Sequence, residues 1–138
     1  MKLFPVPRAL ARRAFFLYVP VLFLATHWPN FKIPVPGRPD LIVHAAVFGL
    51  WTAVLIACGF FGPALAWRNI GWSVPIAAVY SGIDEGLQAI PFIQRHAAWD
   101  DWCANLIGVF GVGAAASLIT LTSRRGPEPP TLRTEPTR

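Results

Sequence analysis

The chain has 138 residues, of which 54% are hydrophobic and 14% are charged, and its mean hydropathy is +0.48. This composition argues against a soluble domain and is typical of an integral membrane protein. The formal net charge is +5, but the basic residues are divided among short loops and the two termini, so the sequence offers no continuous basic face to nucleic acid. We therefore expect an all-α membrane protein that does not bind nucleic acid.

Four apolar segments predict a bundle of about four transmembrane helices over residues 14–122. The expected spans are 14–28, 41–61, 70–90 and 102–121. A helix needs about 20 residues to cross the hydrocarbon. The first segment is shorter and contains Pro20, so it spans only if the preceding Arg12 and Arg13 extend to the interface. A cleaved signal peptide is not expected, because residues 26–28 offer no small-residue cleavage site.

The distribution of Lys and Arg predicts the orientation of the bundle. With four spans, nine of these residues lie on the side of both termini and three lie on the other side. The positive-inside rule then places both termini in the cytoplasm and the loops 29–39 and 91–98 outside. The basic segment 1–13 is expected to be a cytoplasmic N-terminus. The Pro-rich segment 123–138 is expected to be a disordered cytoplasmic tail.

The two cysteines predict neither a disulfide nor a metal centre. Cys58 lies near the inner end of the second span and Cys103 near the outer end of the fourth, so most of the bilayer separates them. Neither has a partner at a metal-ligand spacing, and we therefore predict no metal and no cofactor.

Polar residues recur at one end of the predicted bundle. Three segments each carry two polar residues four positions apart, which places both residues on one face of a helix. The pairs are Asp40 and His44, Asp84 and Gln88, and Asp101 and Asn105. Because successive helices cross the membrane in opposite directions, all three pairs fall at the outer end. Arg95 lies in a loop at the same end, so we expect a shallow polar pocket in the outer leaflet.

Asp84 and Glu85 are the strongest sign of a function, because an ionised carboxylate in hydrocarbon costs on the order of several kcal/mol. The two residues point in different directions, and at most one is expected to share the helix face of Gln88. Both lie near a helix C-terminus, where capping does not explain a negative charge. A buried pair with Arg95, or a protonated acid, remains the structural alternative.

The remaining candidates also have structural explanations. Asp40 and Asp101 stand at predicted helix N-termini, where a carboxylate can act as a cap alone. His44 can be a hydrogen-bonded interior histidine. On the last helix, Gly108 continues the face of Asn105 and Gly111 lies three residues further, so a close helix contact is expected beneath the polar layer.

The stretch from Asp40 to Gly111 resembles the VanZ-like family of small membrane proteins. The matching features are Asp40-Leu-Ile-Val-His44 with Phe48, the block Gly82-Ile-Asp-Glu-Gly-Leu-Gln88, and the spacing of Arg95, Asp101, Asn105 and Gly108. Leu41, Leu87 and the separation of Pro91 from Arg95 depart from the family's pattern. The resemblance implies a multi-pass protein of the bacterial inner (cytoplasmic) membrane. It also implies an association with low-level glycopeptide antibiotic resistance.

The preferred function is an outer-leaflet pocket that binds, and in one version processes, a lipid-linked or cell-envelope molecule among the membrane lipids. Arg95 and His44 would hold a phosphate or carboxylate, and Asp84 or Glu85 would act as a base or bind a cation. The sequence shows no recognisable pairing of a nucleophile with a base, so the catalytic residues stay unassigned and enzymatic activity stays open.

Two further functions have to be compared with this one. The small size and the short first span favour an accessory subunit of a larger membrane complex, for example a respiratory or photosynthetic one. In that case the polar layer would lock the helices together. An ion or proton conductor is disfavoured, because the inner half of the predicted bundle has too few polar residues for a continuous wet path.

Overall fold

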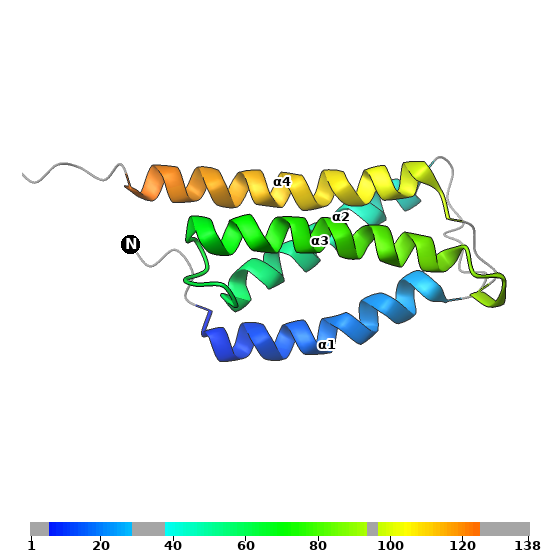
Figure 1. Cartoon of the computed structure of the whole chain (residues 1–138), viewed down its shortest axis with the longest axis horizontal. Coiled ribbons are helices and arrows are strands. Elements are labelled where there is room, and N and C mark those ends of the chain that lie inside the picture. Colours follow the sequence, from blue (N-terminus) through cyan, green and yellow to red (C-terminus); the bar gives the residue numbers. More distant parts are fainter. Residues whose placement is uncertain (1–5, 29–37, 94–96, 125–138) are drawn as a thin grey trace, which may run out of the picture.

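The computed structural model describes residues 6–28, 38–93 and 97–124, and all regular structure within these ranges is helical. The α-helices are α1 (Arg8–His27), α2 (Pro39–Cys58), α3 (Trp67–Gln88) and α4 (Trp99–Arg124), with a short 3-10 helix η1 (Pro91–Ile93) after α3. Figure 1 shows the helices side by side along the long axis of the molecule, with α2 behind α3 and α4. Helix α2 packs most extensively on α4 and also contacts α1 and α3. The expected all-α fold is confirmed.

Helix α1 starts at Arg8, well before the expected residue 14, so part of the predicted N-terminal segment is helical. Arginine is a good helix former, and Arg12 Nε donates a hydrogen bond to the Cys58 carbonyl oxygen at 3.2 Å. The Arg12 guanidinium also lies over the Phe60 ring, 5.2 Å from its centroid. With this earlier start, α1 has 20 residues and is long enough to cross a bilayer. Pro20 stays inside the helix, which changes direction along its length in Figure 1.

The turn between α2 and α3 is held by one buried amide side chain. Helix α2 ends at Cys58, earlier than the expected residue 61, because Gly59 takes a left-handed conformation with φ of 59°. Asn69 Nδ2 then donates to the Ile56 carbonyl oxygen at 2.8 Å and to the Ala64 carbonyl oxygen at 2.9 Å. Its Oδ1 accepts the Phe61 N–H at 3.2 Å. Asn69 therefore fixes the angle at which α3 leaves the turn.

Helices α2 and α4 approach most closely at Gly108. A Cβ at Gly108 would overlap the carbonyl oxygen of Ala45 and lie 2.9 Å from the backbone nitrogen of Gly49. The equivalent position at Gly111 has no atom within 4 Å, so the close contact expected at both glycines centres on Gly108. Helix α4 continues to Arg124, and the rest of the predicted disordered tail, residues 125–138, lies outside the described residues.

Helices α1, α2 and α4 are long and apolar enough to cross a membrane. Large apolar side chains stand on their outer surfaces; Leu17 on α1 and Ile42 on α2, for example, are each 73% exposed. Buried positions in the bundle include many polar residues, the reverse of the pattern in a water-soluble protein. This arrangement identifies a membrane protein. Cys58 is buried, Cys103 is exposed, and both are free thiols.

Helix α3 does not reach the same hydropathy, although a span was expected at residues 70–90. Its sequence contains several polar residues, and six of them are buried in the bundle: Asn69, Ser73, Ser81, Asp84, Glu85 and Gln88. The helix begins at Trp67 and ends at Gln88. Its position between α1 and α4 in Figure 1 brings this polar face against the other helices.

Candidate functional site

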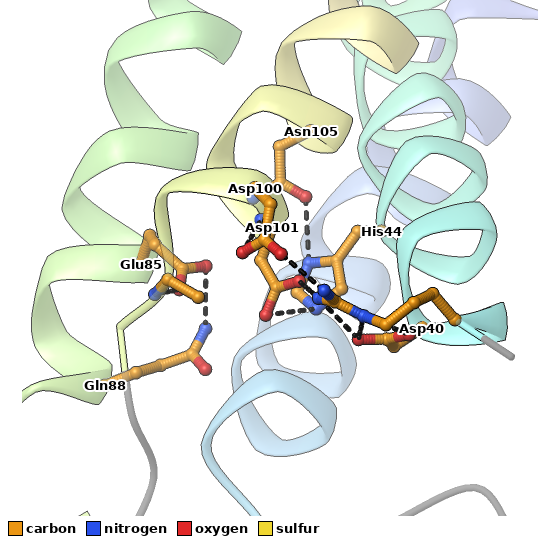
Figure 2. Close-up of polar contacts among 9 residues, drawn as sticks. Asp40, His44, Glu85, Gln88, Asp100, Asp101 and Asn105 are labelled. Atoms are coloured by element: carbon orange, nitrogen blue, oxygen red, sulfur yellow. Dashed lines mark hydrogen bonds and ion pairs between the residues drawn. The ribbon is translucent and has the colours of Figure 1, made fainter.

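Polar side chains from all four helices meet where α1 and α3 end and α2 and α4 begin. We call this set the polar cluster. Its members are Thr26 and His27 from α1, His44 from α2, Asp84, Glu85 and Gln88 from α3, and Asp101 and Asn105 from α4. Every member is buried except Asp101, which is partly exposed. Figure 2 shows the part of the cluster formed by α2, α3 and α4.

His44 connects α2 to α4. Its Nδ1 lies 3.0 Å from Asn105 Oδ1, and its Nε2 lies 3.9 Å from Asp101 Oδ2. Because a carbonyl oxygen can only accept, Nδ1 carries the proton in this amide orientation, and Nε2 faces the carboxylate. The expected shared face of Asp101 and Asn105 is what lets both residues reach the same imidazole.

Asp84 faces α1. Thr26 Oγ1 donates to Asp84 Oδ1 at 3.0 Å, and His27 Nδ1 lies 3.7 Å from the same oxygen. The Asp84 side chain is only 1% exposed. Sequence reasoning did not include Thr26 and His27 among the site residues. The signal was available, because both end the first apolar segment, and the C-terminal ends of α1 and α3 lie at the same end of the bundle.

Glu85 faces the start of α4. Its Oε1 accepts the Ala98 N–H at 2.8 Å, and its Oε2 accepts a hydrogen bond from Gln88 Nε2 at 3.4 Å. We expected at most one of Asp84 and Glu85 to share the face of Gln88. In the structure both carboxylates are buried, and Gln88 bonds to Glu85. Gln88 is four residues from Asp84 and three from Glu85, and both spacings are neighbours on a helix.

Asp40 lies outside the buried cluster, although its spacing placed it on one face with His44. Instead it pairs with Arg38 at the surface, with Arg38 Nη2 3.2 Å from Asp40 Oδ2. The same guanidinium is 2.6 Å from Asp100 Oδ2 and 3.4 Å from Asp101 Oδ1. Hydrogen bonds with Asp100 and Asp40 raise the pKa of Arg38 further above its ordinary value, so it stays charged. Arg38 was not among the predicted site residues, and its ion pairs join the start of α2 to the start of α4. Figure 2 shows Asp40, Asp100 and Asp101 close together at this place.

Three buried polar atoms of the cluster have no hydrogen-bond partner among the residues that the structure describes. They are Asp84 Oδ2, His27 Nε2 and Asn105 Nδ2. Three other buried atoms in the described part of the chain also have no hydrogen-bond partner there: Trp51 Nε1, Ser73 Oγ and Trp102 Nε1. Buried polar atoms are nearly always bonded to protein, water or a ligand. The cluster therefore has unused capacity to bind a water or a polar ligand.

A pocket of about 340 Å³ lies beside the cluster, between the end of α3 and the start of α4. It is lined by Gly82, Glu85, Gly86, Ala97, Ala98, Trp99 and Trp102. Glu85 is the member that joins the pocket to the cluster. Most of the wall is apolar, which suits a ligand that carries both a hydrocarbon part and a charged group.

Arg95, a predicted site residue, lies outside the described residues. Among the residues that are described, no group of three or more His, Cys, Asp or Glu side chains is arranged to hold a metal ion. The polar cluster itself can exchange protons through its carboxylates and imidazoles, and it can hold a cation through Asp84 or Glu85. No protein-family model, no curated protein and no solved structure matches this chain.

Proposed function

We propose that this protein crosses the membrane four times, with α3 as the span that is polar inside and apolar outside. Four large apolar residues form an exposed stripe at helical spacing on α3: Trp72, Ile76, Val79 and Ile83. The 22 residues of α3 extend over about 33 Å, which matches the hydrocarbon thickness. Burying its polar face against α1, α2 and α4 removes the cost of exposing that face to lipid.

The proposed orientation puts both termini in the cytoplasm and the polar cluster at the outer surface. Support comes from the excess of Lys and Arg on the side of the termini. Trp99 and Trp102 at the start of α4 have the interfacial position that indoles favour. The resemblance to VanZ-like proteins points to the bacterial inner membrane as the compartment.

Within this frame, the polar cluster binds the polar head of a lipid or lipid-linked envelope molecule. The observation that carries the proposal is the set of buried polar atoms that lack partners among the described residues, next to a pocket at the same end. A cluster that served only to join helices would satisfy its polar groups internally. An unused acceptor on Asp84 and unused donors on Asn105 instead fit a ligand that is itself polar.

The same site could also process its ligand. Glu85 or Asp84 would accept a proton and His44 would hold a phosphate or carboxylate, which is the chemistry expected of a carboxylate next to an imidazole. The glycopeptide-resistance role of the VanZ-like family would fit a site that binds an envelope precursor. Binding is the part of the proposal that the geometry supports directly.

The test is native mass spectrometry of the protein extracted gently from its own membrane. We expect the wild type to retain one class of polar lipid and Glu85→Gln to lose it. Asp40→Asn is the matched control, because it makes the same carboxylate-to-amide change at an exposed position outside the pocket. Equal lipid retention by all three proteins, each of them folded, would refute a binding role for Glu85.

A second candidate function is an accessory subunit of a larger membrane complex. The supporting observation is an open groove between α2 and α4, lined mostly by small residues: Ala45, Ala46, Gly49, Ala53, Gly108 and Gly111, with Leu50, Ile107 and Val112 at its sides. Small residues allow the backbone of another transmembrane helix to come close. A stoichiometric protein partner in the same mass spectra, without a selectively retained lipid, would favour this function.

A further inference from the structure

The pocket beside Glu85 exists because one of its walls lacks side chains. Gly82 and Gly86 are one turn apart on α3 and both line the pocket. A Cβ at Gly86 would meet no atom within 4 Å, and one at Gly82 would lie 3.4 Å from Trp102 Nε1. Glycine destabilises a helix interior by about 1 kcal/mol relative to alanine. The two glycines therefore cost helix stability, and in return they leave the space of the pocket open.

Among the described residues that line the pocket, Glu85 is the one with a side chain that can carry a full charge. Glu85 is 5% exposed, and its carboxylate is held in place by the Ala98 N–H and the Gln88 amide. None of the described residues that line the pocket carries a positive charge. A carboxylate in a largely apolar wall favours a cationic group that can approach it and disfavours an anionic one.

Two indoles complete the site. The Trp99 and Trp102 rings pack against each other, with centroids 5.5 Å apart and planes inclined by 60°, and both residues line the pocket. Indole faces attract ammonium groups, and pairs of inclined aromatic rings beside a carboxylate suit alkylammonium ligands. Trp99 is 80% exposed, which places this side of the pocket at the surface rather than in the packed core.

Trp102 lies on the wall that faces Gly82 and Glu85. Its Nε1 is buried and has no acceptor among the residues that the structure describes. The indole packs against Gly82, where a Cβ would lie 3.4 Å from Nε1. Trp102 therefore contributes its ring, and not this buried N–H, to the wall of the pocket.

We propose that this pocket binds the ammonium group of an amine-bearing phospholipid headgroup, with Glu85 as the counter-charge and Trp99 and Trp102 as the aromatic walls. The inference rests on the proposed lipid-binding function and names the chemistry of the ligand. Arg38, the described cation at this end of the bundle, is engaged with three carboxylates and does not line the pocket. An anionic headgroup would therefore gain little from Arg38 and would be repelled by Glu85.

The experiment uses the full chain in nanodiscs and measures retention of three defined lipids by native mass spectrometry. The probes are phosphatidylethanolamine, its N-acetylated derivative, which has no ammonium charge, and phosphatidylglycerol. We expect the wild type to retain phosphatidylethanolamine about tenfold better than the other two, since a charge-assisted contact is lost with each of them. Glu85→Gln should abolish that preference.

Matched variants separate pocket filling from misfolding. A Cβ at Gly86 meets no protein atom within 4 Å, so Gly86→Leu places a side chain in the pocket, and Gly71→Leu makes the same change on the same helix at another exposed glycine whose Cβ position is also open. We expect only Gly86→Leu to lose the retained lipid. Trp99→Leu keeps an apolar side chain at an exposed position and should lower the amine preference about threefold, the size of a surface cation–π contact.

The outcomes distinguish this inference from the proposed function. Equal retention of phosphatidylethanolamine and phosphatidylglycerol that is lost in Gly86→Leu would overturn the amine preference and leave lipid binding standing. No selective retention by the folded wild type would overturn both. Displacement of the bound lipid by soluble O-phosphorylethanolamine would support the same ammonium chemistry with the headgroup alone as the ligand.

Discussion

The two ends of the bundle use buried polar residues in different ways. At the end where α2 turns into α3, Asn69 bonds through both amide hydrogens and its oxygen to backbone groups of the turn. Thr120 Oγ1 reaches the Leu65 carbonyl oxygen there at 2.9 Å. At the opposite end, polar side chains of different helices also bond directly to one another, and Asp84, His27 and Asn105 each keep an atom without a partner among the described residues.

This difference distinguishes buried polar residues that hold the fold together from buried polar residues that are available to a ligand. A buried amide that closes a turn has its bonding capacity used by the fold, and its removal should cost stability. A buried cluster with unused capacity contributes less to stability than its number of polar groups suggests, and its composition is better explained by what it binds. Substitutions at the two ends should therefore differ in whether they lower stability or ligand retention.

The largest effect on stability is expected for Gly108→Leu, in the contact beneath the polar cluster. Its side chain would overlap the backbone of Ala45, so α2 and α4 must separate, at a cost above about 4 kcal/mol. Gly111→Leu is the control, because open space surrounds that position. Thermal unfolding in detergent compares the two, and similar stability would show that the α2–α4 contact is not close at Gly108.

Asn69→Ala should destabilise the protein by about 3 kcal/mol. The change removes three hydrogen bonds at once and takes away the side-chain partners of the Ala64 carbonyl oxygen and the Phe61 N–H in a partly buried turn. The expected readout is a lower midpoint in chemical or thermal unfolding, with lipid retention by the folded fraction unchanged. A loss of retained lipid at normal stability would reverse the roles that we assign to the two ends.

Asp84→Asn should change stability by less than about 1 kcal/mol while weakening ligand retention. The amide keeps an oxygen that can accept from Thr26, and it replaces a buried carboxylate whose second oxygen is unpartnered among the described residues. The same unfolding assay measures the first effect, and native mass spectrometry measures the second. A large loss of stability would mean that Asp84 is chiefly a structural residue.

The smallest effect is expected for Arg38→Ala. Its ion pairs with Asp40 and Asp100 are exposed, and exposed pairs are screened by salt and contribute little. Any decrease in the unfolding temperature should therefore disappear at high ionic strength. Since Arg38 does not line the pocket, retention of the amine-bearing lipid should stay at the wild-type level. A decrease that persists at high salt would assign Arg38 a larger role.

Much of the fold was predictable because membrane helices are long and apolar. The number of helices and the meeting of polar residues at one end follow from alternating helix direction applied to the spacing of Asp84, Asp101 and Asn105. The start of α1 was not predictable from hydropathy, because its first turns contain arginines whose partners, Cys58 and Phe60, are distant in the sequence.

The details of the site depended on side-chain directions that spacing alone does not give. Asp40 and His44 share a helix face, yet a neighbouring arginine draws Asp40 to the surface. Thr26 and His27 were missed although they end the first apolar segment at the same end of the bundle as Asp84, because neither has a polar residue four positions away within that segment. The pocket depends on glycines in α3, whose effect is visible only once the opposite wall is known.

The most direct test of the central claim is an experimental structure of the protein crystallised in a lipid phase that contains lipids from its own membrane. We predict density for a headgroup in the pocket beside Glu85, against Trp99 and Trp102, while the turn at Asn69 contains protein atoms alone. A pocket closed by protein side chains, with Asp84 Oδ2 also paired within the chain, would contradict this prediction.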